Sequence, residues 1–534
     1  MFLILLTWIY MFLVFSIQGE WINRWLFKDK LISIGGISLA GMIFQAIVVT
    51  IVAFFYRINV EYFICNALLT VILFFLHRRT WLNRVKSISN WDWFCRILFL
   101  VIFCLALARS SMLPFFVDNE SYYIQTIKWL NEYGWVKGLA NLHIFLIHGS
   151  PWHALQAAYN FNFIADLFND INGFLFCVVS LLWVDKIFQA RKNIDYQTNR
   201  WLFFLPIFSV LWFQFVDSPS MDLPLYLISL IVIYCVLNRS KVTDLAAILL
   251  AVFLIFIKAS IAPILILVLF MLNKKNWKIF LIFSFLLGAI YVFKGIWLSG
   301  CPLAPFADFR LPVDWAIPEG LNPMNRVDNF NYRNIISEGR VNVILLFAIV
   351  IVVPVYGILS YRKKEQRPIL FFIIAELLLV FLTFTQVRFM LPVLFFPVTY
   401  LFSKIKFTPR MLFGIIYASL LIVMIPMFIN LDIGRLSKNS QIIKADVFRK
   451  QNVLVPAGIT NCPDLTFEVL ECIHFEFHNP VDSSYFMYLT GDGPLPCVRV
   501  KYLQFMYRET GCLPTLIGEE LGEGFKHVNV QKQN

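Results

Sequence analysis

Two short acidic clusters could do chemistry, because each stands where a long apolar segment ends. The first contains Asp118 and Glu120 and follows the apolar segment 94–113, and the second runs from Asp217 to Asp222. A carboxylate at such a boundary could act as a general base if it lies within hydrogen-bond reach of a substrate hydroxyl. Each cluster also has a structural interpretation, since Asp and Ser cap helices and form tight turns.

Five cations form a second set of candidates, because they stand near the predicted outer face of the membrane, where few cations are expected. They are Lys258, Lys294, Arg333, Arg340 and Arg388. Such cations could hold a phosphate group, and an arginine would do so through two parallel hydrogen bonds. The alternative is snorkelling of the charged head group to the lipid surface, which we favour for Lys294.

The composition predicts that these residues are positioned by membrane helices. Of 534 residues, 59% are hydrophobic and only 15% are charged, against roughly 25% charged in soluble proteins. The net charge of +12 comes from short basic runs between apolar segments, which mark cytoplasmic loops. The charge therefore indicates topology, and we expect no nucleic-acid partner.

The apolar segments predict an α-helical polytopic membrane protein of about 12–14 transmembrane helices. They are 2–17, 31–56, 60–76, 94–113, 171–188, 200–216, 222–238, 244–257, 260–272, 277–297, 341–360, 367–386, 389–403 and 411–429. With the basic runs inside, the N-terminus and the tail 430–534 both lie outside.

Three regions are predicted to lie outside the membrane: 114–170, 298–340 and 430–534. The first should contain two amphipathic helices, 121–133 and 152–167, lying at the interface. In the tail, strand-like stretches at 467–477, 483–489 and 496–507 predict a small α/β or mainly β domain. The predicted division is 1–93 for additional N-terminal helices, 94–429 for the core and 430–534 for the outside domain.

Four of the ten cysteines lie close together in the predicted outside tail. They are Cys462, Cys472, Cys497 and Cys512. In an extracytoplasmic segment this spacing predicts two disulfides, with three possible pairings. A zinc site is the competing interpretation, but the tail has no CxxC pair.

Four stretches resemble polytopic glycosyltransferases of the GT-C superfamily, and most of all an uncharacterised bacterial branch of it. The acidic start at Asp118 followed by two predicted helices is similar to that superfamily's first outside loop. The other stretches are NEYGWVKGLANLH at 131–143, GIWLSGCPLAPF at 295–306 and TQVRF at 385–389. Tyr123 departs from the branch's histidine, and residues 385–387 depart from its A-P-D.

The resemblance implies transfer of a sugar from a polyprenyl-phosphate-linked donor to a lipid or glycan acceptor at the outer face of a bacterial cytoplasmic membrane. On that model Asp118 is the general base, and Glu120 or Asp222 orients the acceptor or a divalent metal. Lys258 and Arg388 would neutralise the departing polyprenyl phosphate. The remaining expected substrate-binding residues are Asn141 and His143. The sequence leaves open whether a metal takes part, and the other expected partners are membrane lipids.

Two other functions fit parts of the sequence. An O-antigen-type polysaccharide polymerase would share the helix number and the lipid-linked donors, but its main catalytic loop would lie later in the chain than 114–170. A lipid-linked saccharide flippase or other transporter would place ionisable residues at mid-membrane depth and show inverted repeats. No repeat is apparent in the sequence, so we favour the transferase.

Overall fold

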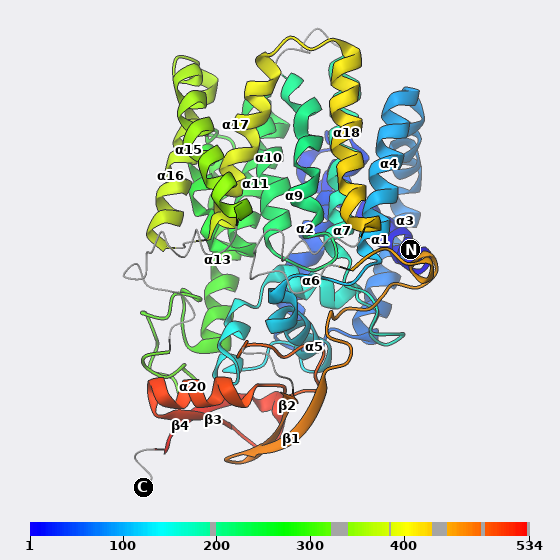
Figure 1. The fold of residues 1–534 in the computed structure, drawn as a ribbon. Coiled ribbons are helices and arrows are strands. Elements are labelled where there is room, and N and C mark those ends of the chain that lie inside the picture. The colour runs from blue at the N-terminus through cyan, green and yellow to red at the C-terminus, as the bar shows by residue number, and fades with distance from the viewer. Residues whose placement is uncertain (193–198, 322–339, 384–385, 430–445, 482–485, 531–534) are drawn as a thin grey trace.

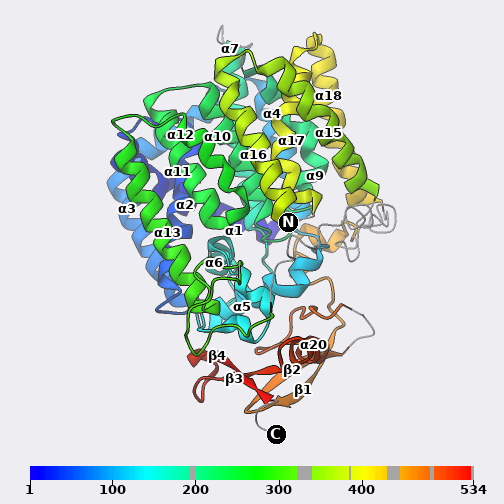
Figure 2. The same cartoon turned by 90° about the vertical axis from the view of Figure 1, so that its left-hand side faces the viewer.

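The protein is a helical bundle with a small layer of helices and strands at one end (Figure 1). The computed structural model describes all residues except 193–198, 322–339, 384–385, 430–445, 482–485 and 531–534. Parts of the predicted outside region 298–340 and of the predicted strand 483–489 therefore lie outside the described residues. The last described strand, β4 (Phe525–Asn529), lies at the end of the molecule away from the long helices (Figures 1 and 2).

Each predicted apolar segment contains a helix, although several helices are short. The bundle helices are α1 (Phe2–Ile22), α2 (Ile34–Val52), α3 (Val60–Lys86), α4 (Trp93–Ser110), α7 (Ile171–Lys192), α9 (Ser209–Phe213), α10 (Asp222–Leu237), α11 (Lys241–Ile257), α12 (Leu265–Leu269), α13 (Trp277–Ser299), α15 (Arg340–Ser360), α16 (Arg367–Thr383), α17 (Leu391–Lys404) and α18 (Pro409–Phe428). Two predicted segments begin as 3₁₀ helices, at Arg200–Phe208 and Ala259–Ile264. A proline lies inside each of these 3₁₀ stretches, where it removes a backbone donor.

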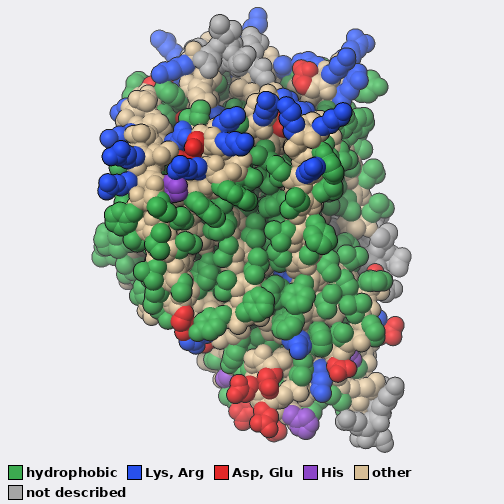
Figure 3. All heavy atoms as spheres, turned by 180° about the vertical axis from the view of Figure 1, so that it is seen from behind, with side chains coloured by type: hydrophobic (Ala, Val, Ile, Leu, Met, Phe, Trp, Pro, Cys, Tyr) green, Lys and Arg blue, Asp and Glu red, His purple; other side chains and the backbone are tan. Residues whose placement is uncertain are grey.

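Ten helices in the described part of the chain are long and apolar enough to cross a membrane. Figure 3 shows a band of hydrophobic side chains around the bundle, with lysines and arginines gathered at the end opposite the strands. This distribution is compatible with a multi-pass membrane protein. It also agrees with the sequence, in which the basic runs lie between apolar segments.

The first two helices pack closely because small residues line their contact. A Cβ atom added at Gly19 of α1 would lie 1.9 Å from the Ile37 carbonyl oxygen, and one at Gly41 of α2 would lie 1.9 Å from the Phe15 carbonyl oxygen. Backbones that approach this closely tolerate only glycine. The N-terminal helices are therefore an integral part of the bundle.

Two short helices, α5 (Ile124–Glu132) and α6 (Pro151–Tyr159), form a layer between the bundle and the strands (Figure 2). Both are shorter than the predicted helices 121–133 and 152–167. Ser150 caps α6, and its side chain accepts a hydrogen bond from the Trp152 backbone. The chain before α5 forms one turn of π-helix, Asn119–Tyr123, a geometry that is frequent at functional sites.

The described part of the tail contains two antiparallel hairpins and the α-helix α20. The hairpins are β1 (Thr466–Cys472) with β2 (Phe475–Val481) and β3 (Cys512–Leu516) with β4 (Phe525–Asn529). The predicted strand 467–477 is thus a hairpin. The predicted strand 496–507 is wrong, because α20 (Val500–Thr510) buries Tyr502, Leu503 and Met506 at helical spacing.

A second apolar core joins the tail to the layer of α5 and α6. It includes Trp129 and Leu130 of α5, Leu298 of α13, and Tyr502 and Phe525 of the tail. The tail is therefore packed onto the rest of the chain. The predicted boundary between 94–429 and 430–534 separates two stretches of sequence. It does not separate two independent cores, because residues of both stretches pack into this core.

The predicted disulfides of the tail are wrong, since no disulfide is found among the described residues. The four cysteines lie in different places: a loop (Cys462), the end of β1 (Cys472), an isolated bridge to His478 of β2 (Cys497) and the start of β3 (Cys512). The sulfur of Cys472 instead lies 3.7 Å from the Pro514 carbonyl oxygen, and that of Cys497 lies 3.5 Å from the Thr490 carbonyl oxygen. Closeness in sequence was therefore a poor guide to closeness in space.

Candidate functional site

Four charged side chains from distant parts of the chain meet at the end of the bundle that faces α5 and α6. Arg388 Nη1 lies 2.7 Å from Asp118 Oδ2, and Arg388 Nε lies 3.7 Å from Asp222 Oδ2. Lys258 Nζ lies 2.6 Å from Asp222 Oδ1. These residues, which we call the charged cluster, were all predicted from the sequence, but in separate groups.

Each member of the charged cluster stands where a helix begins, ends or is interrupted. Asp222 is the first residue of α10, and Lys258 directly follows α11 in an extended conformation. Arg388 lies in the 3₁₀ turn Val387–Met390, just before α17. Asp118 precedes the π-helical turn and forms no capping hydrogen bond with it, so helix capping does not explain its carboxylate.

The charged cluster is partly open rather than sealed in the core. The side chain of Asp222 is 3% exposed, whereas those of Arg388, Lys258 and Asp118 are 15%, 18% and 21% exposed. Phe389 forms an aromatic floor, since Lys258 Nζ lies 3.9 Å from its ring centroid. A ligand could therefore reach both cations and Asp118. The buried carboxylate of Asp222 contacts both cations and holds them in place.

A histidine and two tyrosines border the charged cluster. The hydroxyl of Tyr123 lies 3.4 Å from Ser220 Oγ, and the ring of Tyr122 lies 5.7 Å from that of His148. Burial, reinforced by the positive charges of Lys258, Lys294 and Arg388, lowers the pKa of His148 to about 3. His148 is therefore neutral at physiological pH.

Two residues that the sequence reasoning missed position the charged cluster. Asn172 Nδ2 donates to the carbonyl oxygens of Phe215 and Ser220, both at 2.9 Å, and so shapes the turn before Asp222. Tyr226 donates its hydroxyl to the Arg388 carbonyl oxygen at 2.7 Å. The sequence could have indicated Asn172, because it is a polar residue near the start of a predicted apolar helix.

Glu120 has a different environment from Asp118, although it stands two residues away. Its carboxylate accepts hydrogen bonds from Thr460 Oγ1 at 2.6 Å and from the Asn461 backbone at 2.9 Å. Its carbonyl oxygen accepts from the backbones of Thr490 and Gly491. Burial raises the pKa of Glu120, and these hydrogen bonds oppose that shift. Glu120 therefore fastens two tail segments to the chain beside Asp118.

Asn141 and His143 lie at the junction with the tail and make no contact with the charged cluster. Asn141 Nδ2 donates to the Trp315 carbonyl oxygen at 2.9 Å, and its Oδ1 lies 3.3 Å from His527 Nδ1. The ring of His143 lies 4.8 Å from that of Tyr502. Burial lowers the pKa of His143 to about 3. Both residues connect the outer layer to the tail.

The remaining cations are not part of the charged cluster. Lys294 is buried and donates to the Gly149 carbonyl oxygen, below the rings of Trp135 and Tyr291. The predicted snorkelling of Lys294 to lipid is therefore wrong, because its head group points into the protein. Arg333 and the side chain of Arg340 lie outside the described residues.

A metal has no evident site in the described part of the chain, where no three His, Cys, Asp or Glu side chains gather. Asp222 contacts two cations and Asp118 contacts one. We therefore derive no step through a metal.

The model of one protein family, DUF8201, matches residues 1–395, and the chain belongs to this family, which is described as a domain of unknown function. The match includes all four members of the charged cluster and ends before the tail. No curated protein and no solved structure matches the chain.

Proposed function

We propose that this member of the DUF8201 family is a membrane glycosyltransferase that moves a sugar from a polyprenyl-phosphate-linked donor to an acceptor hydroxyl. The observation that carries the proposal is the meeting of Asp118, Asp222, Lys258 and Arg388, which are separated by up to 270 residues along the chain. One carboxylate and two cations are accessible together. Sugar transfer from a lipid phosphate requires a base and a site for the leaving phosphate, and this set supplies both.

The two cations would hold the phosphate of the donor. Arg388 presents a planar guanidinium, which suits a phosphate, and Lys258 adds a compact charge above the same aromatic ring. Asp222 contacts both cations, so it would keep them in place while their other donors face the ligand.

Donor binding would also prepare the base. Arg388 Nη1 faces Asp118 Oδ2 at 2.7 Å, so a phosphate oxygen that binds this guanidinium would displace the Asp118 carboxylate. Asp118 would then take the proton of the acceptor hydroxyl. That oxygen forms the new bond to the anomeric carbon, the bond from this carbon to the phosphate oxygen breaks, and polyprenyl phosphate leaves as an anion held by the cations.

The proposal includes a location and an orientation. The bundle would span the cytoplasmic membrane of a bacterium, with the charged cluster and the tail at the outer face. The gathering of lysines and arginines at the opposite end of the bundle supports this orientation (Figure 3). An alkaline phosphatase fusion after residue 530 should then be active, and a fusion at residue 364 inactive.

The test is turnover with a panel of lipid-linked sugars. Purified protein in nanodiscs should release polyprenyl phosphate from at least one member of the panel when an acceptor glycan or lipid is present. The Asp118→Asn variant should bind the same donor without releasing polyprenyl phosphate. Absence of polyprenyl phosphate release across the panel of polyprenyl-phosphate sugars would contradict the proposal.

A further inference from the structure

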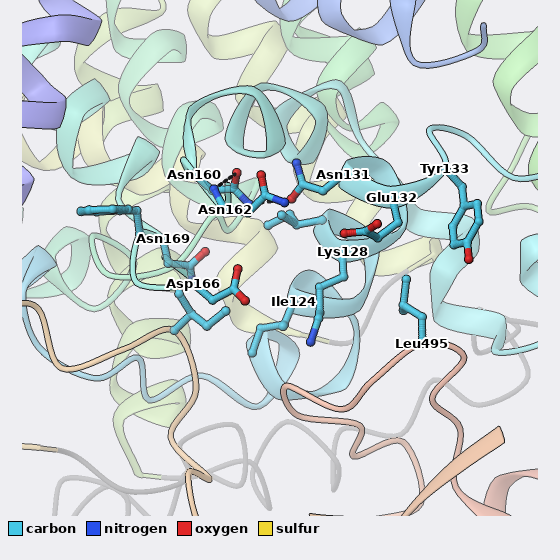
Figure 4. Close-up of a pocket in the computed structure, with 13 residues that line it drawn as sticks. Ile124, Lys128, Asn131, Glu132, Tyr133, Asn160, Asn162, Asp166, Asn169 and Leu495 are labelled. Carbon is cyan, nitrogen blue, oxygen red and sulfur yellow. Dashed lines mark hydrogen bonds between the residues drawn. The ribbon is translucent and has the colours of Figure 1, made fainter. Parts of the chain in front are cut away.

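A polar pocket opens between α5, the segment that follows α6, and two loops of the tail. Its volume is about 310 Å³, and residues Ile459 and Leu495 supply the tail side. Figure 4 shows the carboxylates of Glu132 and Asp166 on opposite sides of the pocket, both directed toward its middle. The pocket is separate from the charged cluster, none of whose members line it.

The pocket carries negative charge that the protein does not compensate. Lys128 also lines it, but its ammonium is engaged by Asp492 Oδ1 at 2.8 Å and by the Asp492 and Gly493 carbonyl oxygens. Among the described residues, neither Glu132 nor Asp166 has a cation within ion-pair distance. Partial desolvation raises the pKa of Asp166, and the neighbouring Asp492 and Glu132 carboxylates raise it further, against an opposing effect of Lys128.

Asparagine side chains form a rigid frame around these carboxylates. Asn131 donates to the Ala157 carbonyl oxygen at 2.9 Å and accepts from Asn160 Nδ2 at 2.6 Å. Asn169 is only 8% exposed and donates to Asn119 Oδ1 at 2.9 Å. The Asn169 Oδ1 atom has no hydrogen-bond donor among the described residues and remains available to a ligand in the pocket.

We propose that this pocket binds a saccharide without negative charge, and prefers one that carries a protonated amino group. Carboxylates and fixed amides together accept and donate the hydrogen bonds that a hydroxyl-rich ligand offers. The volume is near the lower end of ligand sites, which hold about 300–1,000 Å³, so one or two sugar units would fit. The two uncompensated carboxylates attract an amine and repel a uronate or a phosphate.

The pocket fits the acceptor side of the proposed reaction, and to that extent this inference rests on the proposed function. Asn169, at the pocket wall, bonds to Asn119, which directly follows Asp118. An acceptor glycan could therefore be held by a remote sugar in the pocket while its reacting hydroxyl reaches Asp118. Binding energy from such a remote part orients the reacting group.

The test is direct binding of three defined oligosaccharides to the full-length protein in nanodiscs by titration calorimetry. The probes are the tetramer of glucosamine, the tetramer of N-acetylglucosamine and the tetramer of galacturonate. We expect the glucosamine tetramer to bind about tenfold more tightly than its N-acetylated counterpart, because its amines can form ion pairs with Glu132 and Asp166 at the pocket surface. The galacturonate tetramer should bind least, because its carboxylates are repelled.

The matched variants change charge without changing size. Asp166→Asn combined with Glu132→Gln should remove the roughly tenfold preference for the amine while neutral binding remains. The control Glu476→Gln alters an exposed carboxylate on β2 and should bind like the unmodified protein. Failure of all three saccharides to bind, or an unchanged preference in the double variant, would overturn the inference.

Binding measured in this way separates the pocket from the proposed reaction. Saccharide binding without any polyprenyl phosphate release would leave the pocket assignment standing and contradict the proposed function. Release of polyprenyl phosphate without saccharide binding would leave the proposed function standing and contradict the pocket assignment.

Discussion

Two arginine–aspartate pairs lie at ends of bundle helices, and they differ in access. Arg109 of α4 pairs with Asp217, and their side chains are 7% and 0% exposed. Arg388 pairs with Asp118, and their side chains are 15% and 21% exposed. The first pair is sealed by Phe115, whose ring lies 4.6 Å from the Arg109 guanidinium carbon. In the second pair, Arg388 also contacts the carboxylate of Asp222.

The difference teaches that the residue types alone do not identify a site. Both pairs stand at helix ends, and both aspartates belong to clusters that the sequence marks as candidates. A sealed pair can only hold the fold together, since removing one partner leaves a buried charge alone. An open pair beside a lysine can exchange its carboxylate for an external anion, which is the property that the proposed reaction needs.

The largest expected effect comes from removing the base in the open pair. Asp118→Asn keeps the size of the side chain but cannot accept a proton, so turnover should fall by ~10²–10⁴-fold with normal folding. Release of polyprenyl phosphate measures this. Asp314→Asn, an exposed aspartate of the outer region, is the matched control and should retain activity. Full turnover in Asp118→Asn would move the base elsewhere.

The next effect is on stability and concerns the sealed pair. Arg109→Met leaves Asp217 buried without its cation and should lower the free energy of unfolding by about 3–5 kcal/mol. The thermal midpoint of the purified protein reports it. The double variant Arg109→Met/Asp217→Leu should recover much of the loss. A normal thermal midpoint in Arg109→Met would show that the two pairs do not differ in the way described.

Changing the shape of the cation in the open pair should have a smaller effect. Arg388→Lys keeps the charge but loses the planar pair of donors, so donor affinity and turnover should each fall by about tenfold. Arg367→Lys, at the exposed first residue of α16, serves as control. Equal turnover in Arg388→Lys and the unmodified protein would mean that the phosphate is not held by the guanidinium fork.

The smallest effect on turnover is expected at Glu120. This residue lies next to the open pair, but its carboxylate is hydrogen-bonded to the tail. Glu120→Gln weakens the hydrogen bonds to Thr460 and Asn461 and should cost about 1–3 kcal/mol of tail docking. Limited proteolysis of the tail measures it, with Glu471→Gln on β1 as control. Turnover should stay within a few-fold of normal. A ~10²-fold loss with an intact tail would return Glu120 to the chemistry.

The sequence predicted the helices better than it predicted their contacts. Apolar runs have a fixed length and period, so every predicted segment contains a helix. The helix α20 was mistaken for a strand because β-branched and aromatic residues at 496–507 favour strands, while packing of Tyr502 and Met506 favours the helix. The disulfides failed because the distance between cysteines in space depends on the tertiary fold.

The members of the charged cluster were predicted one by one from their positions in the sequence, and it was the resemblance to GT-C enzymes that assigned them to one site. Charge at the end of an apolar segment is visible in the sequence, whereas the approach of Arg388 to Asp118 depends on how α4, α10, α11 and α17 pack. The same limit explains Glu120, whose partners lie some 340 residues away. Asn141 and His143 were chosen by resemblance, and the structure puts both against the tail.

Binding of polyprenyl phosphate to the protein in nanodiscs, measured by native mass spectrometry, tests the central claim most directly. The unmodified protein and Lys406→Ala, which removes an exposed lysine in the loop between α17 and α18, should bind alike. Arg388→Ala and Lys258→Ala should each weaken binding by about tenfold or more. Equal binding by all four proteins would contradict the account, because the open cations would then hold no phosphate.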